Sequence, residues 1–127
     1  MPDDLASVRY IVDDVEAAVD FYTTNLGFAV RMTALPAFAD VVRGPLRLLL
    51  SGPASSGGRQ LPDGRVPEPG GWNRIHLTVD DVEAEVGRLR AAGLRFRSDD
   101  VITGPGGSQI VLDDPFGNPV ELFQPAG

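Results

Sequence analysis

The segment WNRIHLTVDD, residues 72–81, contains the only histidine of the chain, and its residue types are suited to several kinds of chemistry. In a strand the side chains alternate between the two faces, so Arg74, His76 and Thr78 are expected to share one polar face. On that face the imidazole could bind a metal ion, act as a general base or hydrogen-bond a ligand. The alternative is a purely structural role, in which the histidine only forms part of a cavity wall.

The composition limits the classes of function. The 127 residues suffice for one domain with its own core, and the absence of cysteine excludes disulfides, zinc–thiolate sites and thiol nucleophiles. All eleven basic residues are arginines, and the net charge of −7 disfavours nucleic-acid binding but suits a cationic ligand. No apolar run approaches the roughly 20 residues of a membrane span, and no signal segment opens the chain. We therefore expect a cytoplasmic protein with neither nucleic acid nor membrane as a partner.

An octapeptide occurs twice in the chain with one difference. VDDVEAAV begins at Val12 and VDDVEAEV begins at Val79. A strand-like run precedes each copy, and each is followed by a helical pattern that ends in a glycine close to an aromatic residue. This agreement predicts an internal duplication.

Each repeat is predicted to run strand, helix and three further strands. A capping-box spacing places the helix starts at Asp13 and Asp80, and Gly27 and Gly93 are expected to end the helices. The apolar stripe of each helix would cover the apolar face of its sheet. The polar strand faces must then look into a cavity or into solvent.

These patterns predict an α+β fold, a single domain over residues 1–127. It would contain two tandem βαβββ modules whose curved mixed sheets surround a cavity, with the helices on the outer face. Module 1 would span about 5–51 and module 2 about 72–125. The intervening segment 52–71 is rich in Gly, Pro and Ser, and we expect it to be a linker that forms a mobile flap over the cavity.

Three stretches resemble the vicinal oxygen chelate superfamily, which includes glyoxalase I, extradiol dioxygenases, fosfomycin-resistance enzymes and bleomycin-resistance proteins. They are VRYIVDDVEAAVDFYTTNLGF, RIHLTVDDVEAEV and the closing DDPFGNPVELFQP. The resemblance covers nearly the whole chain outside the linker. It is specific for the fold and not for the function, because one scaffold hosts many chemistries.

The resemblance implies four positions that hold a divalent metal as His, Glu, His and Glu in metal-dependent members. Here those positions are Ser7, Arg47, Arg74 and Glu121, with the strand of Arg47 open to a slip of one residue. Arginine has no lone pair to donate and would repel a cation, and His76 with Glu121 supplies only two ligands. We therefore expect no bound metal and no other cofactor.

A guanidinium is instead expected to pair with Glu121 where relatives seat the ion, from either Arg74 or Arg47. Such a pair could contact a ligand or could merely tie two half-sheets together.

Eight residues are the predicted ligand contacts. They are Trp72, Arg74, His76, Glu121, Arg47, Phe38, Arg9 and Phe123. Aromatic residues at a cavity rim stack on planar ligands. The alternative for Trp72 is that it closes the core end, Phe38 and Phe123 are more often simply packing residues, and Arg31 fits surface charge better. No catalytic residue is assigned.

The resemblance is closest in character to the bleomycin-resistance proteins. It implies a homodimer that sequesters a bulky, partly planar aromatic or cationic compound, such as an antitumour antibiotic, and MPDDL resembles their exchanged N-terminal arm. The alternative is a glyoxalase-like or dioxygenase-like enzyme, a lyase, isomerase or oxygenase. It would use a divalent metal or the acid–base pair His76 and Glu121.

Overall fold

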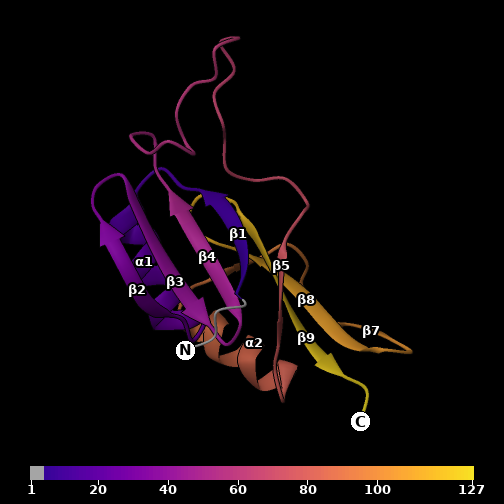
Figure 1. Ribbon diagram of the computed structural model, residues 1–127. Coiled ribbons are helices and arrows are strands. Elements are labelled where there is room, and N and C mark those ends of the chain that lie inside the picture. Colours follow the sequence, from indigo (N-terminus) through magenta and orange to yellow (C-terminus); the bar gives the residue numbers. More distant parts are fainter. Residues whose placement is uncertain (1–4) are drawn as a thin grey trace. The chain divides into compact units, whose positions relative to one another are not determined.

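The computed structural model describes residues 5–127, which form two helices and two mixed sheets (Figure 1). The chain divides into two compact units, Met1–Gly70 and Gly71–Gly127, here called unit 1 and unit 2. Each unit contains one copy of the repeated octapeptide, and each has the βαβββ order that the sequence predicted. The first four residues of the expected N-terminal arm lie outside the described part of the chain.

Unit 1 contains a four-stranded sheet with one helix packed on it. Its elements are β1 (Ala6–Ile11), α1 (Val15–Asn25), β2 (Ala29–Ala34), β3 (Phe38–Arg43) and β4 (Leu46–Ser51). The strand order is β1-β4-β3-β2, with β1 parallel to β4 and the other pairs antiparallel. The first and last strands of the unit are therefore neighbours.

Unit 2 repeats this topology with one strand divided into two. Its elements are β5 (Ile75–Thr78), α2 (Val82–Ala91), β6 (Arg95–Phe96), β7 (Ile102–Gly104), β8 (Gly107–Asp113) and β9 (Pro119–Pro125). The order is β5-β9-β8-β6, and β7 also pairs with β8. Strands β5 and β9 are parallel, as β1 and β4 are.

The core of each unit lies between its helix and one face of its sheet. In β5, Ile75 and Leu77 are buried while His76 and Thr78 are exposed, so the predicted alternation is confirmed. Fully burying an aliphatic side chain contributes about 1.5–3 kcal/mol. The apolar side chains buried between each helix and its sheet therefore supply most of the stability. In unit 1 they include Tyr10, Leu48 and Leu50 of the sheet and Val15, Ala18 and Tyr22 of the helix. In unit 2 they include Ile110, Leu112 and Leu122 of the sheet and Val82, Val86 and Leu89 of the helix.

The helix starts lie one residue later than predicted. Asp14 and Asp81 are the N-caps, and both have an extended backbone. The side chain of each accepts a hydrogen bond from the amide three residues later, Ala17 or Ala84, at 3.1 Å. The sequence presents two consecutive aspartates at each start, and only the second places its carboxylate over the first helical turn. The predicted ends are confirmed, because Gly27 and Gly93 follow the C-caps with φ of 74° and 84°.

The segment 52–71 contains no helix or strand, yet its first part is packed against unit 1. Ser55 is buried, and its hydroxyl donates to the carbonyl of Gly52 at 2.7 Å and accepts from the amide of Gly58 at 3.0 Å. The expectation of a flap along the whole segment is therefore wrong for its beginning. Further on the chain makes a separate exposed turn over residues 61–65.

None of the helices in residues 5–127 has the length and apolar character required to cross a lipid bilayer.

The corrected helix start gives a prediction with an internal control. Asp81→Ala should lower the free energy of unfolding by about 1 kcal/mol, because it leaves the Ala84 amide of α2 without its acceptor. Asp80→Ala, one residue earlier, should change it by less than about 0.5 kcal/mol. Urea denaturation followed by circular dichroism measures both, and equal losses in the two variants would contradict the assigned cap.

Candidate functional site

The polar face of unit 2 is built by the parallel pair β5 and β9. The register places His76 opposite Glu121 and Thr78 opposite Phe123. The rings of His76 and Phe123 lie 4.8 Å apart with a tilt of 39°. Four of the predicted ligand contacts, including Arg74 just before β5, thus come together on one sheet face.

Glu121 is the buried charge of this face, and Arg74 is its partner. Only 8% of Glu121 is exposed, and Arg74 Nε donates to its Oε1 at 3.0 Å. Arg74 Nη1 also donates to the backbone carbonyl of Trp72 at 3.2 Å, which fixes the guanidinium between strand and loop. A carboxylate that loses its water needs such a partner, so the predicted Arg74–Glu121 pair has a physical reason.

His76 lies on the other side of the same carboxylate. Its Nε2 is 3.6 Å from Oε2 of Glu121, which is too long for a hydrogen bond, and its side chain is about half exposed. The imidazole is therefore near the carboxylate but free to turn toward another molecule.

The residues of this face do not fit a divalent metal ion. One oxygen of Glu121 is bonded to Arg74, and a guanidinium can neither ligate a cation nor tolerate one at close range. His76 and Glu121 alone supply fewer ligands than a catalytic ion normally has. Over residues 5–127, no three His, Asp or Glu side chains gather into a possible metal site.

The strand register corrects the predicted equivalence of Arg47 and Glu121. Arg9 pairs with Leu49, and His76 pairs with Glu121. Arg9 and His76 each precede the first aspartate of the repeated octapeptide by four residues, so Leu49 is the counterpart of Glu121. The prediction aligned the two strands by counting residues from the hairpin turn before each of them. The turn between β8 and β9 is longer than the turn between β3 and β4, so this count gave the wrong position.

Arg47 instead belongs to a charged cluster on the sheet of unit 1. It pairs with Ser7 in register, and its Nε lies 3.5 Å from Oδ2 of Asp40. Arg31, which the sequence assigned to the surface, donates to the same oxygen at 3.0 Å. Asp40 is 1% exposed, so two arginines surround one buried carboxylate.

Sequence reasoning missed Asp40, although a signal was present. In FADVVR of β3 the period of two places Phe38, Asp40 and Val42 on the face opposite the buried Ala39 and Val41. The predicted contact Phe38 therefore shares the face of Asp40.

Arg9, another predicted contact, is held on the same sheet. Its Nη1 donates to Oγ of Ser51 at 2.7 Å. Gly57 packs so closely on the guanidinium that a Cβ atom at this position would lie only 2.2 Å from Nη1. Arg9 is therefore covered on one side by the segment that follows β4.

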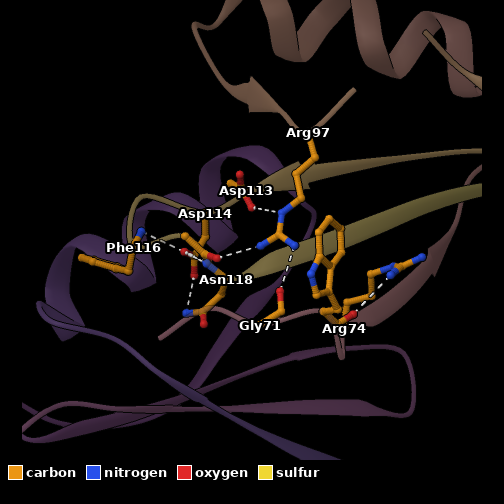
Figure 2. A network of polar contacts seen from close by, with 9 residues as sticks. Gly71, Arg74, Arg97, Asp113, Asp114, Phe116 and Asn118 are labelled. Atoms are coloured by element: carbon orange, nitrogen blue, oxygen red, sulfur yellow. Dashed lines mark hydrogen bonds and ion pairs between the residues drawn. The ribbon is translucent and has the colours of Figure 1, made fainter. Parts of the chain in front are cut away.

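Arg97 is the functional candidate that sequence reasoning missed in unit 2 (Figure 2). Its guanidinium donates to Asp113 Oδ1 at 2.7 Å, to the carbonyl of Gly71 at 2.8 Å and to the carbonyl of Gly117 at 3.0 Å. The same group lies 4.5 Å from the centre of the Trp72 ring. Trp72 is 70% exposed, so an outward-facing indole is held by an arginine that is itself fixed by three acceptors.

The turn DDPFGN supports this arrangement (Figure 2). Asp114 Oδ1 accepts from the amides of Phe116 at 2.8 Å and Asn118 at 2.9 Å, and Oδ2 accepts from Asn118 Nδ2 at 3.0 Å. The predicted turn chemistry is confirmed, and the rigid turn presents the Gly117 carbonyl to Arg97.

Each unit also has a hollow beside the start of its helix. In unit 2 it measures about 670 Å³ and is lined by acidic residues that include Asp80, Glu83 and Asp100. In unit 1 it measures about 490 Å³ and lies between the start of α1 and Leu35–Pro36. None of the eight predicted contacts lines either hollow.

Arg97 gives a stability prediction that Trp72, the only tryptophan, reports directly. Arg97→Met should lower the free energy of unfolding by about 2 kcal/mol, because it removes hydrogen bonds from a charged donor and leaves Asp113 without its partner. The emission of Trp72 should also change, since the cation leaves its ring. Arg95→Met, at an exposed position of β6, is the control. Denaturant titration followed by fluorescence measures both, and an unchanged Arg97→Met protein would refute the role.

Comparison with known proteins places the chain in a family. The chain superimposes on a member of the glyoxalase/bleomycin resistance protein/dioxygenase superfamily from Sphaerobacter thermophilus DSM 20745 with 29% identity, a TM-score of 0.75 and coverage of 94% of this chain and 95% of that one. TnmS3, an antibiotic binding protein from Streptomyces sp. CB03234, is 26% identical, with a TM-score of 0.70 and 98% of both chains covered.

The lactoylglutathione lyase of Agrobacterium tumefaciens has the same fold at 23% identity, with a TM-score of 0.71 and 97% and 94% of the two chains covered. Among curated proteins no sequence matches. The family model of the Glyoxalase/Bleomycin resistance protein/Dioxygenase superfamily matches residues 4–122, and the chain therefore belongs to this superfamily.

Proposed function

We propose that the protein is a metal-independent binding protein that sequesters a bulky, partly planar aromatic compound, such as an antitumour antibiotic. The observation that carries the proposal is the bond between Arg74 Nε and Oε1 of Glu121, at 3.0 Å. It commits the buried carboxylate to a guanidinium, and a guanidinium is a hydrogen-bond donor for ligands and not a metal ligand.

An exposed aromatic surface supports an aromatic ligand. Trp72 shows 70% of its surface, and Arg97 holds its ring from one side. A ring that is already fixed loses little conformational freedom when a planar molecule stacks on it. His76 and Phe123, whose rings lie 4.8 Å apart, add further flat surface on the strand face of unit 2.

Two other observations agree with capture of an antibiotic. TnmS3, which matches almost the full length at 26% identity, is an antibiotic binding protein. The net charge of −7 attracts a cationic compound over distance and repels nucleic acid. We further infer a homodimer, which the resemblance to bleomycin-resistance proteins supports. We also infer a cytoplasmic location, with which the absence of cysteine agrees.

An enzyme is the second candidate function, and one distance favours it. His76 Nε2 lies 3.6 Å from Oε2 of Glu121, so a small rotation of the half-exposed imidazole would form an acid–base pair. Arg74 would orient the carboxylate through its other oxygen. Such a site could move a proton on a bound substrate, as a glyoxalase-like isomerase or lyase requires.

Ligand capture predicts tight binding without turnover. A panel of planar natural products, with doxorubicin and bleomycin among them, should contain a compound that raises the melting temperature, because only the folded chain binds it. Trp72→Ala should weaken the binding of that compound about tenfold or more, as measured by isothermal titration, because the stacking surface is lost. Ile102→Ala, which removes an exposed apolar residue of β7, should leave the affinity unchanged. No stabilisation by any cationic or planar compound would count against capture.

The enzyme alternative predicts a different outcome for the same bound compound. If the protein only sequesters it, mass spectrometry after long incubation should recover the compound unaltered, and His76→Gln should change the affinity by no more than a few fold. Chemical conversion by the wild type that is lost in His76→Gln would establish an enzyme. Protein purified without chelator should contain no stoichiometric nickel, zinc, iron or manganese, and finding one would also refute the capture model.

A further inference from the structure

We propose that Asp40 and Arg47, on the polar face of the unit 1 sheet, form a subsite for a neutral hydroxyl group of the ligand. The inference rests on the proposed ligand capture and adds a chemical requirement to it. It concerns unit 1 alone.

The evidence is a buried acceptor and a buried donor that both lack a partner. Asp40 is 1% exposed, and neither its Oδ1 nor the Nε of Arg47 has a hydrogen-bond partner. Arg47 Nε lies 3.5 Å from Oδ2 of Asp40, beyond the roughly 2.7–3.2 Å of such bonds. Buried polar atoms of folded proteins are almost always satisfied, so these two point to a group that binds between them.

The sheet explains why Oδ1 of Asp40 lacks a partner. The register of β2 and β3 shifts between Val30, which pairs with Val41, and Met32, which pairs with Asp40, so Arg31 is the extra residue between them. A bulge of this kind redirects a side chain, and here Arg31 reaches Oδ2 at 3.0 Å. One oxygen of the carboxylate is therefore occupied, while the other is buried and unpaired.

The chemistry selects a hydroxyl group. Its O–H can donate to Oδ1 of Asp40 while its oxygen accepts from Nε–H of Arg47. An ammonium group only donates, and it would meet the positive charges of Arg31 and Arg47. A carboxylate on the ligand would be repelled by Asp40. Phenols and alcohols offer both the donor that Oδ1 of Asp40 requires and the acceptor that Nε of Arg47 requires, as a water molecule also does.

The experiment compares two probes that share a planar ring system. Emodin carries phenolic O–H groups, and its tri-O-methyl ether keeps the oxygen acceptors but has no O–H donor. In isothermal titration the wild type should bind emodin about tenfold more tightly, as expected for a hydrogen bond to a charged group. Asp40→Asn and Arg47→Lys should lose this preference, and Lys retains the charge while it removes the Nε donor.

The matched control is Asp63→Asn, which changes an exposed ion pair with Arg65 and should keep the full preference. Circular dichroism and thermal unfolding establish that each variant is folded before titration, and Arg47→Lys serves if Asp40→Asn does not fold. Equal affinities in the wild type, or a preference retained in the folded variants, would overturn the subsite while capture stands. Failure of the wild type to bind either probe would also overturn the subsite, whereas capture is refuted only when no compound of the wider panel binds.

Discussion

The polar face of unit 2 depends on one interaction, the bond between the guanidinium of Arg74 and the carboxylate of Glu121. Only 8% of Glu121 is exposed, so the charge cannot be left to water, and the parallel pairing of β5 with β9 prevents it from turning away. The choice of partner decides the chemistry. With a set of neutral imidazoles and carboxylates such a position can hold a cation, whereas a guanidinium satisfies the carboxylate and excludes the cation.

The two units solve the same problem of a buried negative charge in different ways. In unit 2 the buried carboxylate is Glu121 on β9, which pairs with β5, and its partner Arg74 lies just before β5. In unit 1 the counterpart of Glu121 is the apolar Leu49, and the buried carboxylate is Asp40 on β3, next to Arg31 and Arg47. The helix-facing cores remain alike, so the duplicated units differ mainly on the face that is free to take up function.

Local pattern was enough to predict the duplicated fold, because alternation and helix-end signals act over a few residues. The errors arose where a local signal had two solutions. Two consecutive aspartates left the cap ambiguous by one position, and turns of unequal length misplaced Arg47 relative to Glu121. The sequence did not predict the role of Arg97 for another reason. Two of its acceptors are the backbone carbonyls of Gly71 and Gly117, and only the folded chain brings them near the guanidinium.

The contacts of Arg97 bear on how an exposed tryptophan can be a binding surface. A large apolar ring in water costs free energy, and a mobile ring also loses entropy when a ligand arrives. Arg97 reduces the second cost, because its three acceptors fix the cation and the cation fixes the ring of Trp72 at 4.5 Å. The turn held by Asp114 fixes one of those acceptors in turn. Rigidity therefore passes from a turn through a guanidinium to an indole, and the exposed face of that indole is ordered before any ligand is present.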